Sequence, residues 1–301
     1  MASSATTSAV VPTAEPDLQN PAVVIDLFTR AAEANRKNRR RKGCVVHLPK
    51  RGHLLITGDL HDHGLNFQRA VHLAQLHRSK DRHLVLHEVI HGRTRISGKD
   101  FSIRLLARIA ALKLQYPSQV HLIQSNHELA QYWGDNISKG GINSVECFNE
   151  GVEFLYGDEA GAVLEAMNKF LRSYAVAIKC ANGVFISHSL PGIRQMDTFD
   201  PTVLDREPTD DDMRRGGSVY SMVWGRNHPE DIAEELGELW GVHTFVMGHQ
   251  PAEMGYQRQG ESMLILASDH EHGMALPMKL TKEYRRDDLV RALVPLSTVV
   301  L

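Results

Sequence analysis

Residues 54–63 read LLITGDLHDH, an apolar run followed at once by acidic and imidazole side chains. The apolar part predicts a buried β-strand, because it is short and is followed by a glycine. Asp59 and His61 are separated by one residue, and in an extended chain positions i and i+2 point to the same side. Both side chains are therefore expected to reach one metal ion just past the end of the strand.

Four further polar motifs follow apolar runs in the same way. The runs are LVL ending at residue 86, VHLI at 123, VFI at 186 and FVM at 247. The motifs are HEVIHGR at 87–93, SNHE at 125–128, SH at 187–188 and GHQ at 248–250. A lone histidine at a strand end is usually a surface or core residue, and Gly-Asp and Gly-His are frequent turn dipeptides. Five such motifs in order on five predicted strands instead indicate one site assembled from several strand ends.

The order of predicted elements indicates the fold class. From residue 44 onward, strands alternate with helices, which predicts βαβ units and a largely parallel sheet early in the chain. Asn182-Gly183 and Gln259-Gly260 separate short strands and predict later antiparallel pairs. We therefore expect an α/β protein with two packed mixed sheets covered by helices. Ligand sites in such folds lie at the carboxyl ends of strands, where the motifs occur.

Four segments are expected along the chain. Residues 1–20, rich in Ala, Ser, Thr and Pro, predict a disordered lead. Residues 21–50 predict a helix and a basic linker, whose basic run at 36–42 is either a solvated helix end or, less favoured, a polyanion-binding or nuclear-localisation-like patch. Residues 51–281 would form the catalytic domain, and 282–301 a C-terminal tail.

Composition narrows the class of protein. The 301 residues carry a formal net charge of -2, which gives no global electrostatic case for nucleic acid or an anionic membrane. The three cysteines, Cys44, Cys147 and Cys180, form no CxxC pair, which argues against a disulfide scaffold and favours a reducing compartment. The N-terminus lacks the basic and apolar regions of a signal peptide, and no apolar run is long enough to cross a bilayer. A cytoplasmic protein is expected.

The donors in the motifs suit two divalent transition metal ions. Asp59 and Glu88 offer carboxylates, Asn126 an amide oxygen, and His61, His188 and His249 imidazoles. A mixed nitrogen and oxygen set without thiolate favours Mn, Fe or Zn over Ca or Mg. Two such ions roughly 3.5–4 Å apart would hold a bridging hydroxide and polarise a phosphoryl oxygen.

Hydrolysis of a phosphoester also needs a proton donor and cations. His127, next to Asn126, is the candidate donor to the leaving alkoxide. Arg226 and Arg93 are the candidates that bind the equatorial phosphoryl oxygens. For Arg226, the role of an ordinary surface cation stays open.

These motifs resemble those of the calcineurin-like metallophosphoesterase superfamily. They are most similar to the serine/threonine phosphoprotein phosphatases and their bacterial relatives, whose motifs are GDxHG, GDxxDRG, GNHE, a strand-end His and a late His. The resemblance spans about residues 51–280. Many superfamily members have a second His two residues after the last one, and Pro251 at that position favours the phosphoprotein phosphatase branch. The resemblance implies a four-layer α/β/β/α sandwich.

The resemblance also implies a division of ligands between two ions. Asp59, His61 and Glu88 would hold the first ion. Glu88 would bridge to the second, which takes Asn126, His188 and His249 as its other ligands. His127 occupies the position of the family's proton donor.

The second motif departs from the family pattern at three positions. Glu88 replaces the bridging Asp and is one methylene longer. His91 replaces the Asp that orients the proton-donor His, and an imidazole supplies no anionic partner. Gly92 holds the position of a phosphate-clamping Arg, with Arg93 one residue later. Metal binding is expected to be retained, while catalytic efficiency and substrate choice depend on this motif.

Three functions stay open on the sequence. The first is a dinuclear metal-dependent phosphatase that hydrolyses phosphomonoesters, including those of phosphoserine or phosphothreonine in proteins, by attack of a metal-bridging hydroxide. The second is a hydrolase of nucleotides or dinucleoside polyphosphates, and the third is a metal-binding scaffold with weak or no catalysis. The expected partner is a phosphorylated protein or a small phosphoester, with no nucleic acid and no membrane.

Overall fold

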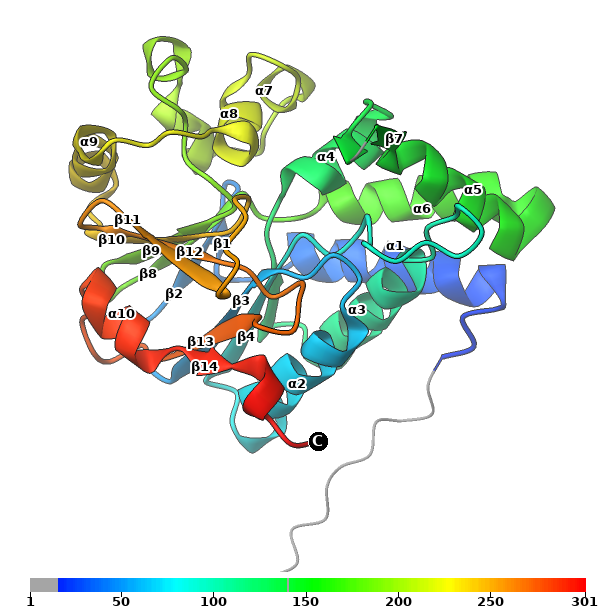
Figure 1. The fold of residues 1–301 in the computed structure, drawn as a ribbon, viewed down its shortest axis with the longest axis horizontal. Helices are drawn as coiled ribbons and strands as arrows, with labels where there is room; N and C mark the ends of the chain where they lie inside the picture. The colour runs from blue at the N-terminus through cyan, green and yellow to red at the C-terminus, as the bar shows by residue number, and fades with distance from the viewer. Residues whose placement is uncertain (1–15, 140) are drawn as a thin grey trace, which may run out of the picture.

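Two packed β-sheets form the centre of the molecule (Figure 1). A computed structural model describes residues 16–139 and 141–301, so the expected disordered lead lies, up to residue 15, outside the described residues. Within the described chain, the larger sheet has the strand order β1-β2-β8-β9-β10-β12-β11 and the smaller one the order β14-β13-β3-β4-β5. A separate pair, β6 and β7, lies apart from both sheets.

The strands of the larger sheet are β1 (Arg41–Lys42), β2 (Val45–Leu48), β8 (Ala177–Cys180), β9 (Val184–Ser187), β10 (Thr244–Met247), β11 (Tyr256–Gln259) and β12 (Met263–Leu266). Those of the smaller sheet are β3 (His53–Asp59), β4 (Arg82–His87), β5 (Val120–Leu122), β13 (Met274–Lys279) and β14 (Val294–Pro295). The separate pair is β6 (Ser138–Lys139) and β7 (Ile142–Asn143). Both large sheets mix parallel pairs, such as β3 with β4 and β9 with β10, and antiparallel pairs, such as β8 with β9. The prediction of two mixed sheets is confirmed.

Helices cover both outer faces. They are α1 (Pro21–Arg36), α2 (Gly64–Ala74), α3 (Ile103–Gln115), α4 (Asn126–Trp133), α5 (Ser144–Tyr156), α6 (Ala160–Arg172), α7 (Asp210–Met213), α8 (Ser218–Trp224), α9 (Glu230–Trp240) and α10 (Arg286–Ala292), with short 3₁₀ turns between them. Figure 1 shows α1, α3, α5 and α6 gathered on one side of the strands and α7 to α9 on another.

Three apolar cores separate the four layers. Alternate residues of β3 face opposite ways, as a pleated strand requires: Leu54 and Ile56 join the core between the sheets, and Leu55 joins the core under α1 to α6. A third core lies between the larger sheet and α8 and α9. This is the α/β/β/α sandwich that the sequence predicts.

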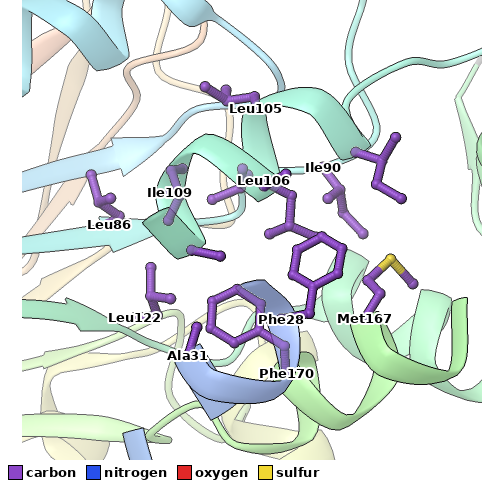
Figure 2. Packing of buried hydrophobic residues seen from close by; sticks show 14 of the residues in the cluster. Phe28, Ala31, Leu86, Ile90, Leu105, Leu106, Ile109, Leu122, Met167 and Phe170 are labelled. Atoms are coloured by element: carbon purple, nitrogen blue, oxygen red, sulfur yellow. The ribbon is translucent and has the colours of Figure 1, made fainter. Parts of the chain in front are cut away.

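Helix α1 is part of the main body, although its residues precede the expected catalytic domain. The Asn20 side chain caps the helix by accepting from Ala22 N, and Pro21 occupies the first turn. Phe28 is fully buried and stacks on Phe170 of α6, with ring centroids 5.6 Å apart (Figure 2). Residues 21–36 therefore contribute to the core that supports the smaller sheet.

Two other segments carry structure that the sequence pattern did not reveal. The polar stretch 134–151 contains most of α5, which the Asn143 side chain caps by accepting from Val145 N. The C-terminal segment forms α10, with Leu289 fully buried, and β14, which pairs antiparallel with β13. The tail thus extends the smaller sheet, because β13 would otherwise expose an unpaired edge.

Lys113 on α3 makes stability depend on pH in a predictable direction. It is 1% exposed, donates to the carbonyls of Pro117 and Val120, and burial lowers its pKa to about 7. Between pH 7 and 10.5 the unfolded chain binds the proton that the folded chain has released, so the free energy of unfolding rises with pH, at most about 1.4 kcal/mol per unit. Denaturant titrations of Lys113→Met should lack this rise, whereas exposed Lys169→Met should keep it.

Candidate active site

The five predicted motifs meet at one pocket. Strands β3, β4, β9 and β10 end next to it, and α4 begins there after β5, with Ser125 as its N-cap. The pocket has a volume of about 390 Å³. Its lining includes eight of the nine residues expected to act in the site: Asp59, His61, Glu88, Arg93, Asn126, His127, Arg226 and His249. His188, the ninth, is fully buried beneath them.

The backbone at the site adopts conformations that are rare for residues with side chains. His61, Asp62, Glu88, His91 and His249 have positive φ values between 35° and 67°. The first two motifs hold each other in this form, since His61 N and Asp62 N donate to the carbonyls of Glu88 and Val89. The Glu128 carboxylate accepts from Val89 N at 2.7 Å and fixes the same loop to α4.

The loop after β10 closes the site against β3. His249 N donates to Asp59 Oδ2 at 2.8 Å, and Gly248 N donates to the carbonyl of His188 at 3.1 Å. A Cβ atom on Gly248 would lie 2.1 Å from Asp59 Oδ1, so this close approach requires glycine. The Asp59 carboxylate is thereby held under the late motif.

Asn126 lies at the centre of one group of donors. Its Oδ1 is 2.7 Å from His188 Nε2 and 2.9 Å from His249 Nδ1, and His188 Nε2 is 3.7 Å from Glu88 Oε1. Burial lowers the pKa of His249 to about 3 and that of His188 well below its ordinary value, so both rings are neutral. This group fits one cation, because a carbonyl oxygen, a carboxylate oxygen and imidazole nitrogens converge without a positive charge.

Glu88 also faces His61. His61 Nδ1 is 3.0 Å from the carbonyl oxygen of Ile90, so a neutral ring carries its proton there and turns an Nε2 lone pair toward Glu88 Oε2, 3.3 Å away. Two lone-pair donors at this distance repel each other unless a cation or a proton lies between them. A divalent ion would resolve this conflict, and the carbonyl of Ile90 would fix the ligand tautomer.

The side chains are grouped differently from the expected division between two ions. Asp59 lies with His87 and His188, and Glu88 lies with His61 and His127, the ligand atoms of each group being within 4.8 Å of one another. Which residues hold which ion therefore stays a prediction. His87 lies in the second motif but belongs to no expected ligand set.

His127 is held by a chain of polar side chains. Its Nδ1 is 2.8 Å from His91 Nδ1, and His91 Nε2 is 2.9 Å from Gln131 Oε1. Gln131 Nε2 donates to Asn149 Oδ1, so its Oε1 is left to accept from His91. Because both rings are buried, two neutral rings cost least, which makes His91 Nδ1 the acceptor from His127 Nδ1–H. His91 thus orients His127 without supplying a negative charge.

Known proteins share this architecture. The chain is 27% identical over 254 residues to a probable serine/threonine-protein phosphatase of Encephalitozoon cuniculi, in an alignment covering 76% of this chain and 50% of that protein. The chain thus spans about half the length of the curated relative it matches. No protein-family profile matches the chain.

Solved structures extend the likeness to the whole sandwich. A Saccharomyces cerevisiae serine/threonine phosphatase with similarity to human phosphatase PP5 aligns with a TM-score of 0.65 at 13% identity, over 91% of this chain and 88% of that chain. The chain has the calcineurin-like phosphoprotein phosphatase fold. A cold-active protein-tyrosine phosphatase of a psychrophilic Shewanella also matches, with a TM-score of 0.52 at 13% identity over 79% of this chain and 78% of that one.

Within this phosphatase fold, the two expected arginines lie at the pocket. Arg93 forms an ion pair with Asp269, with its Nη2 2.5 Å from Oδ2, and its side chain is 57% exposed. Arg226 Nη2 donates to the carbonyl of His249 at 3.4 Å. A Cβ atom on Gly92 would lie 2.8 Å from the Cβ of Asp62, so position 92 has no room for a larger side chain. Arg93 is therefore the cation of the second motif that can approach a bound phosphate.

The variant His91→Asp tests the role of His91. An aspartate at this position would accept the same hydrogen bond and add a negative charge, which favours the protonated form of His127. We expect activity on alkyl phosphates to extend to higher pH and kcat to rise by up to about tenfold. The pH profile of kcat measures this effect, and an identical profile in variant and wild type would contradict the pairing of His91 with His127.

Proposed function

We propose that this chain is a metal-dependent phosphoric monoester hydrolase whose substrates are phosphorylated proteins. The observation that carries the proposal is the lone-pair conflict between His61 Nε2 and Glu88 Oε2, 3.3 Å apart at the pocket. A divalent cation between the two atoms would remove this conflict, and the Asn126 group beside it offers donors for a second one. The substrate class follows the likeness to the probable serine/threonine-protein phosphatase of Encephalitozoon cuniculi.

The proposed ligands are Asp59, His61, Glu88, Asn126, His188 and His249, and Mn, Fe and Zn suit their mixed donors. Two divalent ions held there would activate water near neutral pH and polarise the phosphoryl group. In its protonated form, His127 would give its Nε2 proton to the leaving alkoxide and return to the neutral ring whose Nδ1–H donates to His91. Arg93 and Arg226 would bind the phosphoryl oxygens that point away from the ions.

The lining of the pocket favours a phosphorylated side chain over a free nucleotide as the substrate. Among the described residues, its lining contains no phenylalanine, tyrosine or tryptophan on which a base could stack. The lining instead includes Glu253, Glu271 and His272, which are exposed to solvent, together with the half-buried His270 and the buried Asp269. A phosphorylated side chain that projects from a polypeptide matches this shape better than a free nucleotide.

None of the helices in residues 16–139 and 141–301 has the length and apolar character to span a bilayer.

Metal removal and reloading test the proposal. Protein stripped with a chelator should hydrolyse neither an aryl phosphate nor a phosphoserine peptide, and reloading with Mn, Fe or Zn should restore both activities. Phosphopeptides should be turned over faster than ATP or dinucleoside polyphosphates. Two bound metals per chain without hydrolysis of any phosphoester would instead favour the scaffold hypothesis, and a preference for nucleotides would overturn the substrate class.

A further inference from the structure

His87 is a buried histidine whose ring has no hydrogen-bond partner among the described residues. It is the last residue of β4, it is 0% exposed, and neither ring nitrogen forms a hydrogen bond within residues 16–139 and 141–301. A neutral imidazole carries one N–H donor and one acceptor, and leaving either unsatisfied in the interior destabilises the folded state. The fold therefore keeps a polar ring at a position where an apolar one would be more stable, unless the ring binds something.

The surroundings of His87 indicate what it binds. One ring nitrogen of His87, one carboxylate oxygen of Asp59 and one ring nitrogen of His188 lie within 4.8 Å of one another. His188 Nδ1, which also makes no hydrogen bond to the described residues, is 3.6 Å from Asp59 Oδ1. Buried imidazole nitrogens that converge on a carboxylate oxygen without hydrogen bonds of their own are typical of metal ligands.

A second histidine on the same strand shows the ordinary alternative. His83, four residues earlier on β4, is 1% exposed, and its Nδ1 is 3.1 Å from Nε2 of His121 on β5. Burial also lowers the pKa of His83, to about 4. A buried histidine of β4 can therefore find a partner on the neighbouring strand, whereas His87 faces Asp59 and His188 instead.

We propose that His87 is a metal ligand of this chain and that, with Asp59 and His188, it forms a two-histidine, one-carboxylate set for one ion. The proposal rests on the proposed function only in requiring that metal binds at this centre. His87 and His188 lie beneath the pocket rather than in its lining, so substrate does not compete with them for the ion. The additional imidazole favours Zn or Fe over the harder ions Mg and Ca.

Metal binding to His87→Leu tests this inference, with His83→Leu as the matched control. Metal content after dialysis and competition with a chelator should show one ion bound at least tenfold more weakly in His87→Leu and unchanged in His83→Leu. Thermal unfolding is a second measurement, and it distinguishes a metal ligand from a residue that only supports the fold. Metal-free His87→Leu should unfold at the wild-type temperature or higher, because it lacks the unsatisfied ring, while its stabilisation by metal should shrink.

The outcomes separate this inference from the proposed function. Wild-type metal content and chelator competition in His87→Leu, with active wild-type enzyme, would overturn the role of His87 and leave the proposed function intact. Wild-type protein that binds no divalent metal would overturn both. If His87→Leu does not fold, His87→Gln keeps a polar side chain at the position and must show the same weakening for the inference to stand.

Discussion

The variant His249→Ala should lose metal-dependent phosphatase activity by at least about 100-fold, because even residues that only support metal ligands change affinity or activity by 10–100-fold. His249 places Nδ1 2.9 Å from Asn126 Oδ1, and its backbone N–H holds Asp59. The substitution removes the imidazole but keeps the backbone hydrogen bond, so the effect should fall on the ion that Asn126 would hold.

Three measurements decide this prediction. Metal analysis should show loss or weakening of one ion, hydrolysis of an aryl phosphate should fall with it, and a large excess of metal should restore part of the activity. His121→Ala is the control, since His121 is also a buried histidine but pairs with His83 away from the pocket. Equal activity in His249→Ala and wild type would remove His249 from the metal centre.

The expected site could be located from the sequence because its residues follow strands. Asp59, His188 and His249 stand at or near the ends of β3, β9 and β10. Strands β9 and β10 are neighbours in the larger sheet and β3 lies in the smaller sheet, and ligand sites in such folds lie at the carboxyl ends of the strands. The same argument predicts the two sheets, since buried runs and hairpin turns are local features of the chain. The local pattern of apolar runs, turns and polar residues therefore predicts both the layers of the fold and the position of the pocket.

Features that depend on side-chain direction could not be predicted in this way. Glu88 and His91 have φ values of 35° and 60°, which no pattern of apolar residues encodes, and this backbone turns the second motif toward α4. The partner of His91, Gln131, lies one turn beyond His127 on α4 and becomes recognisable only when the two motifs are in contact. In the sequence, an imidazole at the position of the family's carboxylate indicates that the interaction with the proton donor has been lost. In the structure, the imidazole takes the place of the carboxylate and forms the hydrogen bond.

Long-range packing explains the other differences. Helix α1 has an amphipathic pattern, but its assignment to the main body depends on Phe170, 142 positions away from Phe28. The C-terminal residues form β14 only because β13 offers an edge to pair with. Both contacts join segments that are distant in the sequence, so no window of neighbouring residues contains them.

The variant His127→Asn should lower kcat by about 10²–10⁴-fold on a phosphoserine peptide, which is the usual contribution of a general acid. The loss should be much smaller on an aryl phosphate with an acidic phenol, because a good leaving group departs without a proton. Kinetics on a series of aryl phosphates should therefore show a steeper dependence on leaving-group acidity in the variant than in the wild type. A uniform loss across the series would contradict the role of His127 as proton donor.

Metal content of the same variant distinguishes the two roles that the geometry allows for His127. Its Nε2 is 3.9 Å from Glu88 Oε1, and it belongs to the group that Glu88 forms with His61, so it could bind an ion instead of donating a proton. The hydrogen bond to His91 favours the proton donor, because it fixes the ring in an orientation that does not depend on metal. A proton donor predicts His127→Asn with wild-type metal content and a leaving-group-dependent loss. A ligand predicts loss of metal and an equal decrease for every substrate, and both results come from one preparation.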